Sequence, residues 1–346
     1  MSRVTIADVA GAAGVSKTAV SFAFNNPERL AQATLERVLG VARDLGYTPH
    51  PAARALSTRR SGSIGVLIPQ PLSAVFANPF LSELIQGLGE LCEKHDLTLL
   101  LVPPLDGSLE SAIRNASVDG FISLGLSPDD RALQVLDGLG IPAVLVDSED
   151  SDAHPVVNVD DQGGAAAAAN HLLGLGHRRL AVMVLPPARA LRAHTPTANR
   201  RLAGYRAAIE AAGAPAPLTV TAGISVAAGM RAFESLPSGR QKPTGLLAMS
   251  DMAAIGVLNA AQASGVRVPV DLSVVGFDDL PLSAWTNPPL TTVHQPIVEK
   301  GRIAARLLIE RMNGKGVDGP APLKTSLVVR NSTAEPRAAD LQIRRR

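Results

Sequence analysis

The chain has 346 residues and is 46% hydrophobic, so it fits two or three folded units and is too long for one small domain. Residues 1–60 hold eight Lys and Arg against four Asp and Glu, whereas the remainder holds 25 against 27, which places a basic segment at one end of a slightly acidic chain. Its single cysteine excludes a disulfide within the chain, and no apolar run reaches the length of a membrane span.

The first two predicted helices lie within residues 5–25. Thr5 can cap the first helix, and Gly14 interrupts the apolar pattern where a tight turn fits. Ser16 is a good N-cap for a second helix, predicted over residues 17–24. Two short helices joined by a glycine-containing turn form a helix-turn-helix unit, whose second helix can enter the major groove of DNA.

The second helix carries polar side chains that can contact phosphates or base edges, namely Lys17, Thr18, Ser21 and Asn25. An alternative stays open on this stretch alone, because short helical pairs with polar faces also occur in packed helical domains.

A third amphipathic helix is predicted from its apolar positions, Leu35, Val38, Leu39, Ala42 and Leu45. Gly46 suits its C-terminal end. Pro51 suits the first position of one more short helix, over residues 52–56, and residues 59–62 form a polar linker.

Together, VTIADVAGAAGVSKTAVSFAFN and LGYTPHPAARAL resemble the DNA-binding head and hinge of the LacI family of bacterial transcription repressors. In that family two hinge helices of a dimer lie in the minor groove, where a leucine wedges a central base step apart. The resemblance assigns this wedge to Leu56, with Ala53 on the same face, and an apolar wedge is a known means of kinking DNA. The alternative is that Leu56 anchors the linker to the core. The residues expected at DNA are Thr5, Ser16, Lys17, Thr18, Ser21, Phe22, Asn25, Tyr47, Ala53 and Leu56.

Two positions depart from the family pattern. Phe22 stands where the second helix usually carries an arginine, which removes the common guanine contact and leaves either a thymine methyl contact or internal packing for the ring. Ala31 stands where a capping serine or threonine is usual, so we expect the start of the third helix to be weaker by about 1 kcal/mol.

After the linker, short apolar strands alternate with helical patterns, and the pattern restarts near residue 156. Strands are predicted over 63–68, 97–102, 120–124, 142–147, 156–159, 179–185, 245–249, 273–277 and 323–329. Helices are predicted over 79–95, 109–116, 130–139, 163–175, 199–212, 226–236, 252–264 and 296–312. Such alternation favours right-handed crossovers and mostly parallel sheets. The expected fold class is therefore α/β, with an all-α helix-turn-helix head and a core of two doubly wound lobes.

GVLIPQ, GHRRLAVM and SVVGFDDLPLSAWTNPPLTTVHQP resemble the periplasmic-binding-protein-like core of the same family. The expected domains are a head over residues 1–60, with its hinge helix at about 50–58, and a core over 61–340. Lobe 1 is expected at about 61–160 and 293–322, and lobe 2 at about 161–292 and 323–340. Ligands of such sheets bind outside the carboxyl ends of the strands, which places an effector in the cleft between the lobes.

The resemblance places an arginine and an aspartate in that cleft, at Arg201 and Asp278, where they hydrogen-bond an effector. An arginine fork beside a carboxylate suits vicinal hydroxyls. The alternative is that the two residues pair only with neighbours. Further candidates are Asp147 and Ser250 at other strand ends, and Phe80 and Trp285 as apolar faces for a sugar ring, although core or loop packing explains both aromatic residues equally well.

The resulting hypothesis is a cytoplasmic, homodimeric repressor that binds double-stranded operator DNA under control of a small, sugar-like effector. No cofactor, metal site or membrane partner is expected, and no P-loop, GxGxxG after a strand or GxSxG motif indicates an enzyme. The alternatives are a sugar-binding protein or an enzyme on the same scaffold without operator binding. A regulator of the opposite sign also remains open.

Overall fold

The computed structural model describes residues 4–48, 60–70, 72–127, 129–185 and 196–337. One compact unit contains the N-terminal residues up to Ser63 together with Ser117–Asp119, and the other contains Ile64–Ala116 and the chain from Gly120 onward. The predicted hinge helix, with Ala53 and Leu56, lies outside the described residues.

The N-terminal unit consists of α1 (Ile6–Ala13), α2 (Lys17–Asn25), the short helix η1 (Pro27–Arg29) and α3 (Gln32–Asp44). Gly14 follows α1 with φ of 63°, a conformation that glycine adopts without strain, and so allows the tight turn into α2. Seven buried apolar side chains from the three α-helices form the core of this unit, namely Val9, Ala10, Ala13, Val20, Ala23, Val38 and Ala42. The predicted helix-turn-helix is therefore present.

The ends of these helices differ in how well they are capped. The Thr5 main-chain N–H donates to Asp8 Oδ2 at 2.8 Å and the Thr5 hydroxyl to the same oxygen at 2.7 Å, which fixes the start of α1. Ser16 Oγ accepts from the Ala19 N–H at 3.1 Å at the start of α2. Ala31 occupies the N-cap of α3 without a side-chain hydrogen bond, and the weaker start expected there stays a prediction.

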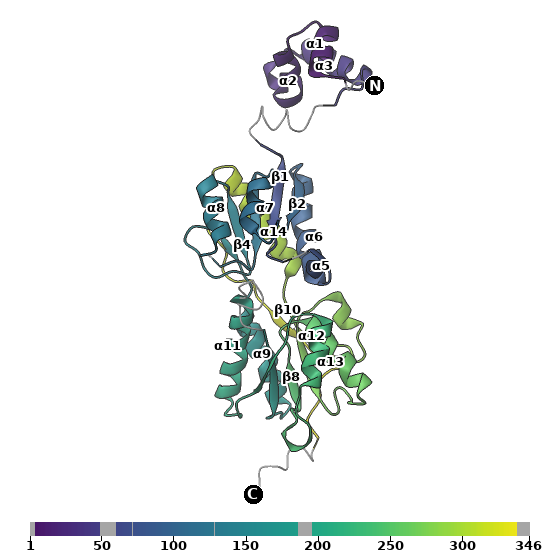
Figure 1. Cartoon of the computed structure of the whole chain (residues 1–346), viewed down its shortest axis with the longest axis vertical. Coiled ribbons are helices and arrows are strands. Elements are labelled where there is room, and N and C mark those ends of the chain that lie inside the picture. Colours follow the sequence, from purple (N-terminus) through teal and green to yellow (C-terminus); the bar gives the residue numbers. More distant parts are fainter. Residues whose placement is uncertain (1–3, 49–59, 71, 128, 186–195, 338–346) are drawn as a thin grey trace. The chain divides into compact units, whose positions relative to one another are not determined.

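Lobe 1 of the larger unit is a five-stranded sheet in the order β2-β1-β3-β4-β5, flanked by helices (Figure 1), and the pairs from β1 through β5 are parallel. Its strands are β1 (Ser63–Leu67), β2 (Thr98–Val102), β3 (Gly120–Leu124), β4 (Ala143–Val146) and β5 (Val156–Val157). Its helices are α5 (Leu72–Val75), α6 (Pro79–Lys94), α7 (Leu109–Asn115), α8 (Arg131–Leu139) and α14 (Ile297–Met312).

Lobe 2 is a six-stranded sheet in the order β11-β10-β9-β8-β6-β7. Its strands are β6 (Leu180–Val184), β7 (Leu218–Thr221), β8 (Gly245–Leu247), β9 (Ser273–Asp278), β10 (Thr291–His294) and β11 (Ser326–Val328). Its helices are α9 (Asp161–Gly174), α11 (Pro196–Ala211), α12 (Val226–Glu234) and α13 (Asp251–Ala263), with the short turns η2 (Gly239–Gln241) and η3 (Pro281–Ala284). All neighbouring strands are parallel except β11, which runs antiparallel to β10. Together with lobe 1 and the helical head, this sheet confirms the predicted fold class.

The chain passes between the lobes after β5, after β10 and before β11. The predicted crossing near residue 292 falls within β10, which stays in the lobe 2 sheet through His294. The helix after that crossing, α14, packs closely against α6. A Cβ added at Gly87 of α6 would lie 1.9 Å from the Val298 carbonyl oxygen of α14, so only glycine fits there. The helices of the described part include none that is both long and apolar enough to span a bilayer.

Candidate functional site

The outer face of α2 carries the polar side chains predicted to meet DNA. Lys17 and Thr18 are exposed, whereas Ser21, Phe22 and Asn25 are half-buried. Asn25 Nδ2 donates to Ser21 Oγ at 3.3 Å, one helical turn back. These side chains therefore lie along one helix at the spacing that a groove-binding helix needs.

Three further predicted DNA contacts have structural roles within the head. Thr5 and Ser16 take part in the two helix caps described above. The Tyr47 ring packs against Phe24, with centroids 5.7 Å apart and a tilt of 59°. Their contact with DNA stays a prediction.

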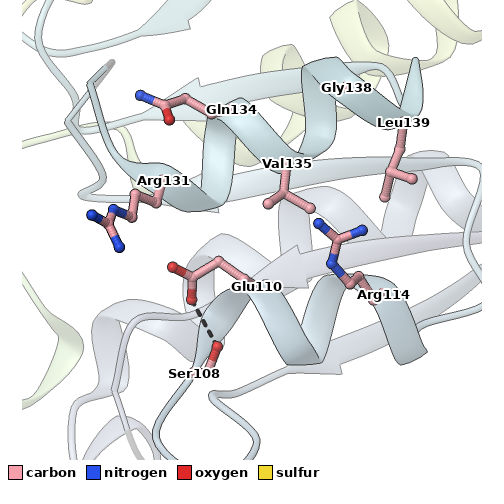
Figure 2. Close-up of a pocket in the computed structure, with 8 residues that line it drawn as sticks. All are labelled: Ser108, Glu110, Arg114, Arg131, Gln134, Val135, Gly138 and Leu139. Carbon is pink, nitrogen blue, oxygen red and sulfur yellow. Dashed lines mark hydrogen bonds between the residues drawn. The ribbon is translucent and has the colours of Figure 1, made fainter.

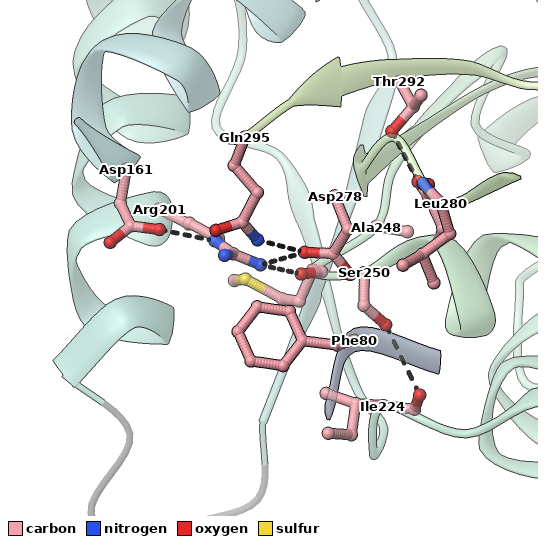
Figure 3. A network of polar contacts seen from close by, with 12 residues as sticks. Phe80, Asp161, Arg201, Ile224, Ala248, Ser250, Asp278, Leu280, Thr292 and Gln295 are labelled. Carbon is pink, nitrogen blue, oxygen red and sulfur yellow. Dashed lines mark hydrogen bonds and ion pairs between the residues drawn. The ribbon is translucent and has the colours of Figure 1, made fainter. Parts of the chain in front are cut away.

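At the predicted effector site, Arg201 of α11 is held by several groups of lobe 2 (Figure 3). Its Nε donates to Asp161 Oδ1 at 2.8 Å and its Nη1 to the Met249 carbonyl at 2.5 Å, while Nη1 lies 3.5 Å from Asp278 Oδ1. The guanidinium carbon is 3.6 Å from the centroid of the Phe277 ring. The structure thus brings Arg201 and Asp278 together and fixes the plane of the arginine.

Asp278 ends β9 with φ of 128° and is buried. Burial raises the pKa of Asp278 to about 7, although the Arg201 charge opposes the shift, while nearby Asp251 adds to it. Gln295 Nε2 donates to Asp278 Oδ1 at 2.6 Å. Near neutral pH this carboxyl group can therefore offer either a donor or an acceptor to a ligand.

Lys300 of α14 connects this cluster to lobe 1. It is fully buried, and its Nζ donates to Asp147 Oδ1 at 2.7 Å and to Gln295 Oε1 at 2.9 Å. The same nitrogen lies 5.2 Å from the centroid of the Phe80 ring. Because an ammonium group only donates hydrogen bonds, Oε1 of Gln295 must face Lys300 and Nε2 must face Asp278.

These contacts form one polar relay, running through Asp147, Lys300, Gln295, Asp278, Arg201 and Asp161. Asp147 belongs to lobe 1, following β4, whereas Asp278 and Arg201 belong to lobe 2. The relay crosses between the lobes at Gln295, in the link between β10 and α14. It joins the predicted effector contacts of both lobes.

A second connection between the lobes runs through Arg200. Its Nε donates to Asp161 Oδ2 at 3.0 Å, Nη1 to the Ser148 carbonyl at 3.0 Å and Nη2 to Asn158 Oδ1 at 3.3 Å. Asp161 is fully buried and accepts hydrogen bonds from both this arginine and Arg201. A hollow of about 380 Å³ adjoins it, lined by Glu149, Asp150, Asn158, Val159, Pro196, Asn199, Arg200 and Pro322.

Another hollow, of about 490 Å³, lies on lobe 1 between α7 and α8 (Figure 2). Arg114 and Arg131 are exposed on it, and Ser108 Oγ donates to Glu110 Oε2 at 2.7 Å. None of the predicted effector residues lines this hollow. It is separate from the relay.

The other three predicted effector residues, Ser250, Trp285 and Phe80, differ in whether they contact the relay. Ser250 caps α13, accepting from the Ala253 N–H at 3.3 Å, and its hydroxyl donates to the Ile224 carbonyl at 3.4 Å. The Trp285 residue is 77% exposed, and among the described residues no hydrogen bond or ion pair joins it to the relay. Phe80 does face the relay, through Lys300.

Sequence reasoning missed Asp161, Arg200, Gln295 and Lys300. One signal was present, because Lys300 interrupts the apolar face of its helix between Ile297 and Gly301, where a lysine is unusual. The pairing of the other three depends on tertiary contacts that no local pattern reveals.

The chain matches the family model for bacterial regulatory proteins of the lacI family over residues 5–50, and a model for a periplasmic binding protein-like domain over residues 169–333. It is 32% identical to the HTH-type transcriptional repressor CytR of Escherichia coli K12, over 95% of this chain and 96% of that protein. The chain belongs to the lacI family of bacterial regulatory proteins.

Two solved structures of this family resemble the whole chain. The lac repressor dimer bound to operator and the anti-inducer ONPF is 27% identical with a TM-score of 0.81, covering 96% of this chain and 100% of that one. The complex of the transcriptional regulator CelR with cellobiose is 30% identical with a TM-score of 0.71, covering 95% and 100%. This lacI-family chain is therefore a DNA-binding transcriptional regulator and not an enzyme.

Proposed function

We propose that this regulator is a repressor whose operator affinity is changed by a small, neutral, hydroxyl-rich effector bound at the relay between the lobes. The observation that carries the proposal is the continuous set of hydrogen bonds and ion pairs from Asp147 in lobe 1 to Asp278 and Arg201 in lobe 2. A ligand that contacts both ends of this set is sensitive to the separation of the lobes.

The polar groups favour a neutral ligand because most charges are already paired. Lys300 is paired with Asp147, and Arg201 with Asp161, at 2.7 and 2.8 Å. Among the described residues, no hydrogen bond or ion pair joins Oδ2 of Asp147, Oδ2 of Asp278 or Nη2 of Arg201, so these groups are the ones proposed to contact the ligand. Acceptors beside a donor fork suit vicinal hydroxyls, and the cellobiose complex of CelR supports a sugar.

Such a ligand regulates only if it binds two arrangements of the lobes with different affinity. The three crossings between the lobes allow the closure motion that is common in two-lobed binding folds. A coupling of about 1–3 kcal/mol, or roughly 5- to 150-fold in operator affinity, is typical of such systems. We expect this regulator to fall in that range.

We further propose that the protein acts in the cytoplasm as a homodimer, as the lac repressor structure is a dimer on its operator. Residues 1–60 then bind one half of a near-palindromic operator through α2. The hinge residues Ala53 and Leu56 are proposed to enter the minor groove at its centre.

The test begins with selection of an operator from a random duplex library by the full-length protein. Operator affinity is then measured with and without each neutral sugar of a panel that includes D-ribose and cellobiose. We expect one sugar to shift the affinity of the native protein, and Asp278→Ala to lose the shift while keeping the sugar-free operator affinity. The exposed carboxylate of Asp318 supplies the control, Asp318→Ala, which should respond as the native protein does. An unchanged response in Asp278→Ala would contradict the proposed site.

A further inference from the structure

The DNA-facing helix of this regulator is poor in positive charge. The sequence of α2 is KTAVSFAFN, in which Lys17 is the only charged residue and lies at the N-terminal end. Phe22, half-buried in the second turn, stands where the family resemblance leads us to expect an arginine. A helix that enters the major groove normally needs a donor fork at its centre to recognise guanine.

The missing cation is supplied from outside the helix. The α2 helix ends at Asn25, and Asn26 then leaves the helical conformation with φ of −147° and ψ of 61°. The chain turns back in η1, where the Arg29 N–H donates to the Asn26 carbonyl at 3.0 Å. This turn places the Arg29 guanidinium carbon 5.3 Å from the centroid of the Phe22 ring.

The Arg29 guanidinium is available for a partner. The residue is exposed, and within the described residues no hydrogen bond or ion pair engages its side chain. Its contact with the Phe22 ring restricts the orientation of the planar group while leaving the N–H groups at its edge unoccupied. An arginine held in this way loses less conformational freedom on binding than a free one.

We propose that Arg29 and Phe22 act as one operator-contacting pair. Arg29 donates two hydrogen bonds to O6 and N7 of a guanine in the major groove, and the Phe22 ring contacts the C5-methyl group of a neighbouring thymine. Both contacts follow from the donor, acceptor and methyl pattern of base edges in that groove. The ring thus orients the arginine and makes an apolar base contact of its own.

A phosphate contact by Arg29 is the competing explanation, and it differs in a measurable way. A base contact fixes the preferred base at one position of each half-site, whereas a phosphate contact strengthens binding to every sequence. It also adds about one to the slope of the logarithm of affinity against the logarithm of salt concentration, in magnitude.

The experiment is selection from a random duplex library by the full-length protein, followed by affinity measurements at several salt concentrations. The variants are Arg29→Ala, Arg29→Lys, Phe22→Leu and the double variant Arg29→Ala with Phe22→Leu. Arg43→Ala, which removes another exposed arginine in the last turn of α3, is the control. Circular dichroism of each variant shows whether the head still folds, and Phe22→Leu keeps an apolar side chain there.

We expect the native protein to enrich an inverted repeat with a guanine next to a thymine in each half. Arg29→Ala should lose the guanine preference at that position alone and bind the native site roughly 5- to 150-fold more weakly, as loss of one bidentate base contact predicts. Arg29→Lys should weaken the guanine preference less than Arg29→Ala does, because an ammonium group still donates to guanine but lacks the planar fork that the Phe22 ring orients. The double variant should be little worse than Arg29→Ala, and Arg43→Ala should keep the native motif.

Uniform weakening by Arg29→Ala, with an unchanged motif and a smaller salt slope, would overturn the proposal in favour of a phosphate contact. Independent, multiplicative losses in the double variant would also overturn it, because the pair would then not act as a unit. If the native protein itself enriched no repeat, sequence-specific DNA binding would fail together with this pair. That outcome is distinct from a native motif that Arg29→Ala leaves intact.

Discussion

Replacement of Asp278 by asparagine should make the stability of the core less dependent on pH. Burial raises the pKa of this carboxyl group from the ordinary 3.8 to about 7. The folded state therefore binds a proton more tightly than the unfolded state does. The resulting stabilisation is complete below the ordinary pKa and is lost as the pH rises through about 7.

The magnitude follows from the size of the shift. Each pH unit between about pH 5 and the folded pKa contributes about 1.4 kcal/mol, so the native protein loses about 3 kcal/mol of unfolding free energy between about pH 5 and about pH 8. Asparagine does not titrate, and its Oδ1 can still accept the Gln295 hydrogen bond. The unfolding free energy of Asp278→Asn minus that of the native protein should therefore rise by about 3 kcal/mol across this range.

Urea unfolding of the two full-length proteins measures this difference at each pH. Because Trp285 is 77% exposed in the folded state, unfolding is followed by far-ultraviolet circular dichroism of the helices rather than by tryptophan fluorescence. The other titrating groups are shared by both proteins and cancel in the difference. A difference that stayed constant from about pH 5 to about pH 8 would show that Asp278 titrates as an ordinary aspartate, and would refute the account of its burial.

Three further changes have defined outcomes. Lys300→Met leaves the Asp147 carboxylate without its buried cation and should lower the free energy of urea unfolding by about 3 kcal/mol. Lys94→Met, at an exposed position, is the control and should change that free energy by no more than about 0.5 kcal/mol. Equal losses in the two variants would show that the relay does not stabilise the fold. Asp251→Ala removes the carboxylate that accepts from one buried N–H and two hydroxyl groups, at 2.8, 2.5 and 2.5 Å. It should lower the unfolding free energy by about 3 kcal/mol or more, which thermal unfolding shows as a lower midpoint temperature; a near-native midpoint would contradict this expectation. Ala31→Ser adds the missing cap and should slow hydrogen exchange of the α3 amides by about 1 kcal/mol in opening free energy; unchanged exchange would show that the cap does not form.

Much of the fold followed from local patterns. Strands that are buried on both faces, such as β3, begin and end where their apolar runs do. The edge strand β7 was not predicted, because only Val220 of its four residues is buried and the run carries little hydrophobic signal. The α2 sequence showed an aromatic ring at Phe22, but the return of Arg29 over that ring depends on the turn through η1.

The effector site was predictable only in part. The resemblance to a known family indicated Arg201 and Asp278, and in the structure Nη1 of Arg201 lies 3.5 Å from Oδ1 of Asp278. Lys300 and Gln295 come from the second segment that contributes to lobe 1, and their partners are more than a hundred residues away or across a lobe boundary. Such partners are set by packing of whole lobes, so no local period in the sequence reveals them.

The central claim is that ligand binding between the lobes and operator binding by the head share one free energy of coupling. Its most direct test is the dissociation constant of the effective sugar, measured by titration calorimetry with the full-length protein alone and with saturating operator duplex. We predict a change by the same factor, roughly 5- to 150-fold, that the sugar produces in operator affinity, because coupling is reciprocal. Equal sugar affinity with and without operator would contradict the account.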